Sequence, residues 1–166
     1  MKLAFLGLGV MGAPMARHLV ANGNDVTVFN RNTKKASDWV AAHGGQFRMS
    51  PKEAAHGCDM VLVCVGNDDD VRSVVHGEDG ALAGMQPDAV LVDHTTASAQ
   101  LARELEAASG ARNVAFVDAP VSGGQAGAES GALTIMCGGS VKAFDRAQPV
   151  LQTYAKSVRR MGEAGA

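Results

Sequence analysis

The sequence predicts an α/β fold, a doubly wound and mostly parallel sheet with helices on both of its faces. Short apolar runs alternate with segments of helical periodicity, which is the order of βαβ units in a parallel sheet. The apolar runs are nearly continuous, as strands buried on both faces require. In addition, the glycine-rich stretch LGLGVMG lies between the first apolar run and the first helical segment.

The individual elements follow from the same alternation. The apolar runs predict strands at Lys2–Leu6, Asp25–Asn30, Asp59–Val65, Ala89–Asp93 and Asn113–Asp118. The segments between them predict helices at Val10–Asn22, Thr33–His43, Pro51–His56 and Ser98–Ser109. Beyond these, we expect a Gly- and Ser-rich segment, a strand, a helix and an edge strand, at Ser122–Gly131, Leu133–Cys137, Val141–Tyr154 and Ser157–Met161. Pro14 fits the first turn of the first helix, where its missing N–H has no helical partner.

Composition excludes several classes of protein. The 166 residues are 46% hydrophobic and carry a formal net charge of −2, which indicates a domain with a substantial core and argues against a nucleic-acid partner. No apolar stretch approaches the roughly 20 residues that span a bilayer, and the N-terminus lacks a signal-peptide pattern. We therefore expect a cytoplasmic protein without membrane contact.

Cysteine and histidine residues show no metal-ligand spacing. Cys58, Cys64 and Cys137 form no C-x-x-C pair and are expected to be buried structural thiols. His94 lies near the predicted site, but a Ser122–His94–Asp118 hydrolytic triad would lack the G-x-S-x-G turn of such enzymes. We therefore expect no metal site in this chain and no catalytic role for His94 or for such a triad.

The string G-x-G-x-x-G predicts a dinucleotide-binding turn, because it follows a predicted strand, opens a predicted helix and precedes a second strand. In such a Rossmann-type domain, Gly7 permits the tight turn, Gly9 lets the backbone approach a pyrophosphate, and Gly12 allows close packing of helix on strand. The helix N-terminus offers N–H groups and a partial positive charge to the phosphates. We assign the whole turn to the cofactor: Gly7, Leu8, Gly9, Val10, Met11 and Gly12.

The end of the second strand favours NADP(H), with NAD(H) as the open alternative. An NAD site usually carries an acid about 20 residues after the glycines, whereas an NADP site has a neutral residue and a nearby arginine. Here Asn30 stands in place of the acid, and Arg31 offers a planar fork for a phosphate. We assign this segment to the cofactor as well: Asn30, Arg31, Asn32 and Lys35. The competing interpretation is a solvated basic face.

Three stretches resemble the β-hydroxyacid dehydrogenase family, which includes 3-hydroxyisobutyrate dehydrogenase and the semialdehyde reductases. The opening GLGVMGAPMARHL is similar to the family's first motif, and DAPVSGGQAGAESGALTIMCGG, from Asp118 to Gly139, is similar to its substrate-binding signature. DHTTAS, from Asp93 to Ser98, resembles the stretch that lines its nicotinamide pocket. The resemblance implies a Rossmann-type domain that binds NAD(P) for an oxidoreductase acting on a short hydroxyacid or semialdehyde.

The resemblance also implies further site residues. It places Val65, Gly66 and Asn67 beside the adenosine half of the cofactor and Thr96 beside the nicotinamide. It also places Ser122, Gly123 and Gly124 at the substrate carboxylate, where two successive glycines uncover backbone N–H groups. Alternatively, Asn67 caps a solvated helix that begins with three acids, and the glycine pair packs tightly under a helix.

The resemblance finally implies that the chain is the cofactor-binding portion of a longer enzyme. We expect an NAD(P)-binding domain over residues 1–162 and the start of a linker at residues 163–166. The family's general acid is a lysine that would lie beyond Ala166, and an all-helical C-terminal domain would make the intact parent a homo-oligomer. We expect cofactor binding without turnover. The alternatives are a non-catalytic dinucleotide sensor and an enzyme like imine reductase or 6-phosphogluconate dehydrogenase.

Overall fold

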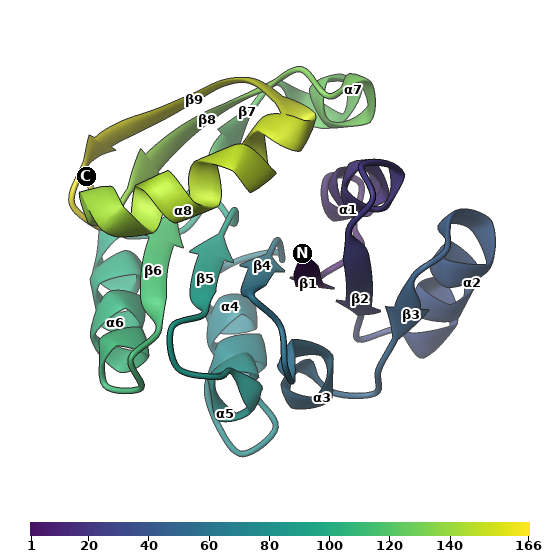
Figure 1. The fold of residues 1–166 in the computed structure, drawn as a ribbon, viewed down its shortest axis with the longest axis horizontal. Coiled ribbons are helices and arrows are strands. Elements are labelled where there is room, and N and C mark those ends of the chain that lie inside the picture. Colours follow the sequence, from purple (N-terminus) through teal and green to yellow (C-terminus); the bar gives the residue numbers. More distant parts are fainter.

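The computed structural model describes residues 1–166 and confirms a mostly parallel α/β sheet (Figure 1). Six strands lie side by side in the order β3-β2-β1-β4-β5-β6, and every pair among them is parallel. This is the strand order of a dinucleotide-binding Rossmann sheet. Strands β7, β8 and β9 continue the sheet: β8 runs antiparallel to β6 and β7, and β9 runs parallel to β8.

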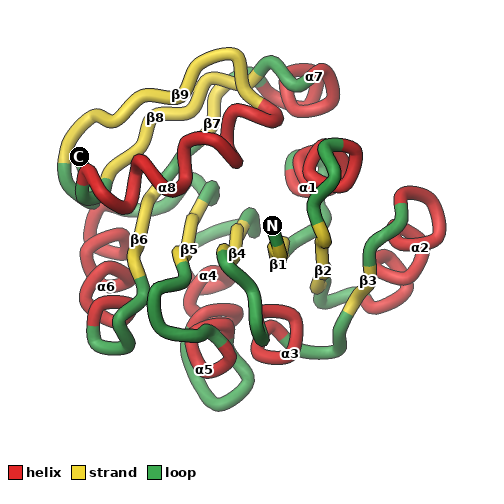
Figure 2. The backbone as a smooth tube through the Cα atoms, viewed as in Figure 1, coloured by secondary structure: helices red, strands yellow, loops and turns green.

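The elements alternate along the chain as Figure 2 shows. The strands are β1 (Lys2–Leu6), β2 (Asp25–Phe29), β3 (Gln46–Phe47), β4 (Met60–Val63), β5 (Val90–Asp93), β6 (Ala115–Asp118), β7 (Val121–Ser122), β8 (Leu133–Gly138) and β9 (Ala155–Gly162). The helices are α1 (Gly12–Ala21), α2 (Thr33–His43), α3 (Pro51–Ala55), α4 (Asp68–Val75), α5 (Ala81–Gly84), α6 (Ala99–Gly110), α7 (Gly124–Ser130), α8 (Val141–Leu151) and the short 3₁₀ turn η1 (Gln152–Tyr154).

Two apolar cores cover the two faces of the sheet. Because successive side chains of a strand point to opposite faces, Leu3 and Phe5 of β1 enter one core, and Ala4 and Leu6 enter the other. Helices α1, α2 and α8 pack into the first core, whereas α3, α4, α5 and α6 pack into the second. Burial on both faces explains why the parallel strands are continuously apolar.

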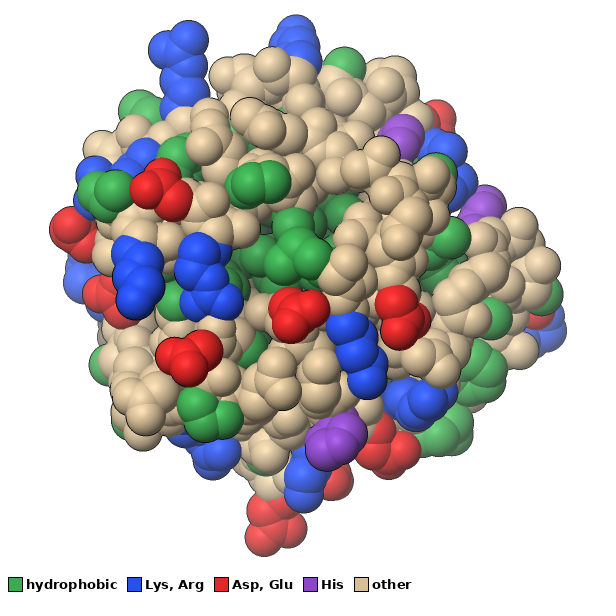
Figure 3. Space-filling view, viewed as in Figure 1, with side chains coloured by type: hydrophobic (Ala, Val, Ile, Leu, Met, Phe, Trp, Pro, Cys, Tyr) green, Lys and Arg blue, Asp and Glu red, His purple; other side chains and the backbone are tan.

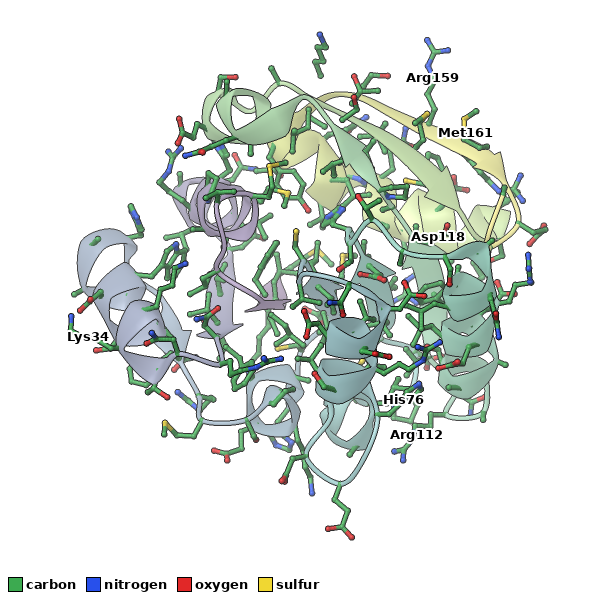
Figure 4. All side chains as sticks on the ribbon, turned by 180° about the vertical axis from the view of Figure 1, so that it is seen from behind. Lys34, His76, Arg112, Asp118, Arg159 and Met161 are labelled. Atoms are coloured by element: carbon green, nitrogen blue, oxygen red, sulfur yellow. The ribbon has the colours of Figure 1, made fainter.

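The C-terminal strands fold back over helix α8. The helix contacts β5 and β6 on one side and β8 and β9 on the other, as Figure 1 shows. Phe144 and Leu151 of α8 belong to the first core, together with Val158 of β9. On the outer side of β9, Arg159 and Met161 point away from the molecule (Figure 4).

The structure corrects several expected elements. The sequence did not predict the short elements β3, α5 and β7. For α4, it predicted only a capped start as an alternative, and not the whole helix. The Gly- and Ser-rich segment, for which no regular element was expected, contains the end of β7 and the helix α7. The last predicted helix ends at Leu151 and continues as the turn η1, and β9 is longer than expected at both ends.

The surface mixes charges of both signs. On the face seen in Figure 3, Lys and Arg side chains lie among Asp and Glu side chains, and no large field of one sign forms. None of the helices combines the length and the apolar character needed to cross a membrane.

Candidate cofactor site

A cavity of about 740 Å³ opens at the carboxyl ends of β1, β2 and β4. Its volume lies within the roughly 300–1,000 Å³ that is typical of small-molecule sites. The chain winds from β1 to β2 in one direction and reaches β4 on the other side of β1. The cavity therefore lies at the topological switch point, where open α/β sheets bind their ligands.

The glycine loop forms one wall of this cavity. Gly7 has φ of +104°, and a Cβ there would collide with the carbonyl oxygen of Cys64. A Cβ on Gly12 would collide with the carbonyl oxygen of Gly7, so helix α1 packs tightly against the turn. Gly9 differs, because a Cβ there would meet nothing within 4 Å. The backbone at Gly9 is thus bare toward the cavity, as close approach of a ligand requires.

The N-terminus of helix α1 faces the cavity and has no side-chain cap. The helices α2, α4, α6 and α8 are each capped by a side chain, from Asn32, Asn67, Ser98 and Ser140 respectively. Helix α1 has no side-chain cap, and the N–H groups of residues 9–12 have no acceptor within the chain. Unpaired N–H groups at a helix N-terminus favour an anion such as a pyrophosphate.

Asn30, directly after β2, lines the cavity opposite the glycine loop. Asn30 Oδ1 accepts a hydrogen bond from the Leu8 N–H at 2.9 Å, and its Nδ2 donates to the Asn32 carbonyl at 3.2 Å. The Asn30 side chain therefore holds the glycine loop against β2. The Arg31 side chain is 79% exposed and donates to Asp70 Oδ1 of helix α4 at 3.2 Å.

The structure brings together most of the residues that the sequence assigned to a cofactor. The cavity is lined by twelve of them: Gly7, Leu8, Gly9, Val10, Met11, Gly12, Asn30, Arg31, Asn32, Lys35, Val65 and Gly66. Asn67 lies outside, because its side chain accepts the Asp70 N–H and caps α4. Thr96 is exposed and lines neither this cavity nor the one at the carboxyl ends of β5 and β6.

Sequence reasoning missed four residues of the lining, namely Phe29, Cys64, Asp70 and Val74. Phe29 ends β2 and Cys64 follows β4. Their position at the carboxyl edge of the sheet is the signal that could have placed them at the cavity. Asp70 and Val74 face the cavity from helix α4. Their spacing of four residues on one helix face would have placed them together.

A second, smaller cavity of about 200 Å³ lies at the carboxyl ends of β5 and β6. Asp93 and Asp118 both line it. Burial raises the pKa of the Asp93 carboxyl to about 6, although its Oδ1 accepts the Thr95 N–H at 3.0 Å. Burial also raises the pKa of Asp118, whose Oδ1 accepts the Gly165 N–H at 3.2 Å.

Thr95 links this edge of the sheet to the larger cavity. Its Oγ1 accepts a hydrogen bond at 3.0 Å from the N–H of Val65, a lining residue of the larger cavity. The wall of that cavity is thereby held by the loop after β5. This contact is made by Thr95 and not by its neighbour Thr96, which the resemblance assigns to the nicotinamide.

His94 is a buried structural residue. Its ring is 1% exposed, with Nδ1 at 2.7 Å from the Ala119 carbonyl and Nε2 at 2.6 Å from the Tyr154 hydroxyl. Because a carbonyl only accepts, Nδ1 carries the proton and Nε2 accepts from Tyr154. Burial lowers the pKa of His94 to about 4. Both ring nitrogens are occupied away from Ser122 and Asp118, so the triad does not form.

The expected substrate segment lies on the surface. Ser122 ends β7, opposite Thr134 of β8, and Gly123 and Gly124 open helix α7. All three residues are exposed, and none lines either of the two cavities at the carboxyl edge of the sheet. Positive φ values of +132° and +63° at Gly123 and Gly124 explain the glycine pair.

The three thiols are not equally buried. Cys58 and Cys137 are buried, but Cys64 is only partly buried and faces the larger cavity. This corrects the expectation for Cys64, whose position at the end of β4 opens it toward the cavity. Burial raises the pKa of the Cys64 thiol to about 12, so the thiol is protonated at neutral pH.

Residues 2–162 match the family described as the NAD binding domain of 6-phosphogluconate dehydrogenase. An oxidoreductase from Shewanella frigidimarina is 57% identical over 165 residues, which cover 99% of this chain and 57% of that protein. A probable 3-hydroxyisobutyrate dehydrogenase-like protein of Arabidopsis thaliana is 43% identical over 99% of this chain and 54% of its own length. The chain thus spans about half the length of the curated relatives it matches.

A solved structure agrees with these similarities. The 3-hydroxyisobutyrate dehydrogenase of Mycobacterium tuberculosis, determined with L-serine, superimposes with a TM-score of 0.93 at 38% identity. The superposition covers 99% of this chain and 55% of that one.

Proposed function

Because the chain belongs to the family of NAD binding domains found in 6-phosphogluconate dehydrogenase, we propose that it is the cofactor-binding portion of a β-hydroxyacid dehydrogenase. In this proposal it binds NADP(H) in preference to NAD(H), and the intact enzyme transfers hydride to or from a short β-hydroxyacid or semialdehyde. The names of the Arabidopsis and Mycobacterium relatives support 3-hydroxyisobutyrate or a compound of similar size as the substrate.

The observation that carries the proposal is the fit of the larger cavity to a dinucleotide. The uncapped N-terminus of α1 and the bare backbone at Gly9 face one cavity at the switch point of the sheet. An anion is the ligand that such a helix end favours. The residues present therefore fit the pyrophosphate of NAD(P).

The preference for NADP(H) rests on the end of β2. The Asn30 amide is already engaged by Leu8 and Asn32 and carries no charge. The exposed Arg31 guanidinium and the exposed Lys35 ammonium both line the cavity. Two cations and no acid at this end of the strand favour a 2′-phosphate over a free 2′-hydroxyl.

In the mechanism, this chain binds and orients while the nicotinamide supplies the hydride chemistry when it is bound. The α1 N-terminus and residues 9–12 hold the pyrophosphate through backbone N–H groups. Thr95 holds the cavity wall at Val65 and so maintains its shape. Ser122, Gly123 and Gly124 are proposed to receive the substrate carboxylate. No residue of this chain is proposed to move the proton, which we assign to a lysine of the intact enzyme.

A pair of titrations tests the proposal. Reduced NADPH and NADH are each added to the chain in the same buffer, and energy transfer from Trp39 is followed. Trp39 is the single tryptophan, and its Nε1 donates to the Ala13 carbonyl of α1, close to the glycine loop. We expect saturable binding, with NADPH tighter by about tenfold, or about 1.4 kcal/mol. Absence of binding for both cofactors would contradict the proposal.

Turnover separates this proposal from its alternatives. The 166-residue chain is mixed with NADPH or NADP⁺ and a panel of hydroxyacids, semialdehydes and cyclic imines. We expect no turnover by the chain alone, because substrate positioning and proton transfer each contribute orders of magnitude in rate. In the intact parent we expect turnover of hydroxyacids. An intact parent that binds cofactor but reduces nothing would favour the sensor, and one that reduces imines would favour an imine reductase.

A further inference from the structure

The first turn of helix α4 carries three consecutive acids, and the structure gives each a different partner. Asp68 accepts hydrogen bonds from the N–H and the hydroxyl of Ser98, at 3.1 and 2.6 Å. Asp69 pairs with Arg72 of its own helix at 3.2 Å and is 93% exposed. Asp70 alone has its partner across the cavity, where Arg31 donates to it at 3.2 Å.

The Asp70 carboxylate belongs to the cavity wall. A Cβ on Gly66 would approach Asp70 Oδ2 to 2.6 Å, so the carboxylate packs over the bare backbone after β4. Asp70, Arg31 and Gly66 all line the same cavity. The Asp70 side chain is 32% exposed, whereas that of Arg31 is 79% exposed, so the pair bridges helix α4 and the end of β2 at the cavity mouth.

We propose that Asp70 is a specificity-determining residue that weakens the preference for NADP(H) over NAD(H), by holding the Arg31 guanidinium that a 2′-phosphate requires. This inference rests on the proposed function, since it concerns the same dinucleotide site. The 2′-phosphate and the Asp70 carboxylate are like charges that compete for one planar cation. The free 2′-hydroxyl of NAD(H) carries no charge, so the competition does not affect it.

The arrangement explains an otherwise contradictory set of residues. The end of β2 has the neutral amide and the cation of an NADP site, yet an acid from another helix neutralises that cation. A carboxylate close to a bound phosphate opposes its binding through like-charge repulsion. Asp70 therefore tunes the site toward use of both cofactors.

Substitution of Asp70 by asparagine tests the inference, with Asp69→Asn as its matched control. Both changes remove one charge from the same helix turn, but Asp69 does not line the cavity. Dissociation constants for NADPH and NADH are measured for the wild type and both variants at low salt. We expect Asp70→Asn to tighten NADPH about tenfold and to change NADH less than twofold. We expect Asp69→Asn to leave the ratio of the two constants within twofold of wild type.

The outcomes are distinct. An unchanged NADPH-to-NADH ratio in Asp70→Asn would overturn the inference while leaving the proposed function intact. An equal gain in Asp69→Asn would also overturn it, because the effect would then come from general charge near α4. Wild-type protein that binds neither cofactor would instead contradict the proposed function. In 0.5 M salt, the advantage of Asp70→Asn should shrink, since screening weakens exposed charge interactions.

Discussion

Replacement of Gly9 by alanine separates the role of the glycine loop in binding from its role in the fold. The φ of Gly9 lies outside the left-handed region, and a Cβ there would meet no atom within 4 Å. The folded chain therefore accepts alanine. Since alanine also restricts the unfolded chain, we expect the free energy of unfolding to stay equal to wild type or rise by about 0.4–1 kcal/mol.

Binding should respond in the opposite direction. The added carbon of Gly9→Ala stands in the cavity, on the backbone that a pyrophosphate must approach. We expect the affinity for NADPH to fall at least tenfold, which corresponds to about 1.4 kcal/mol. Fluorescence titration measures the affinity, and urea unfolding of the same sample measures the stability.

Gly7→Ala is the contrasting variant. Gly7 has φ of +104°, and a Cβ there would strike the Cys64 carbonyl. The backbone strain alone costs about 1–3 kcal/mol, so we expect this variant to lose stability as well as binding. Wild-type affinity for NADPH in Gly9→Ala, or wild-type stability in Gly7→Ala, would contradict these roles of the two glycines.

Two further predictions concern Asp93, which ends β5, and the buried His94 that follows it. The pKa of Asp93 is about 6 in the folded chain against an ordinary value of 3.8. The folded state therefore holds this proton more tightly than the unfolded state does. The stability that results is present below pH 3.8 and is lost as the pH rises through 6. Urea unfolding should therefore show the stability of wild type relative to Asp93→Asn falling by about 3 kcal/mol between pH 3.8 and 7, and a flat difference would contradict the raised pKa. Tyr154→Phe leaves the buried Nε2 of His94 without its donor. This change should lower the free energy of unfolding by about 1–3 kcal/mol. A loss below about 0.5 kcal/mol in urea unfolding, with an unchanged m-value, would mean that the hydrogen bond does not stabilise the fold.

The parallel core of the fold is predictable from the sequence because its signals are local. Near-continuous apolar runs identify the buried strands, and β1 and α2 have the predicted bounds. The missed elements lack such signals: β3 and β7 are two-residue strands whose pairing depends on a neighbour. Helix α7 contains two glycines, which have low helix propensity, and a run of small residues that shows no clear hydrophobic periodicity. Its packing against α1 is a tertiary contact, which can override low propensity.

The candidate site divides in the same way. The glycine loop and the end of β2 were predictable because each belongs to one short motif with a mechanical reason. The pairing of Asp70 with Arg31 was not predictable, since it joins residues 39 positions apart. His94 and Tyr154, 60 positions apart, were likewise beyond local reasoning. Contacts between loops after different strands depend on strand order, which the sequence pattern alone does not specify.

The proposed function depends on dinucleotide binding at the N-terminus of helix α1. Amide chemical shifts of the ¹⁵N-labelled chain during addition of NADPH test it most directly, because the N–H groups of residues 9–12 have no acceptor within the chain. We expect the largest shifts at these four amides and at Arg31. Shifts that avoid the glycine loop and gather at another surface would contradict it.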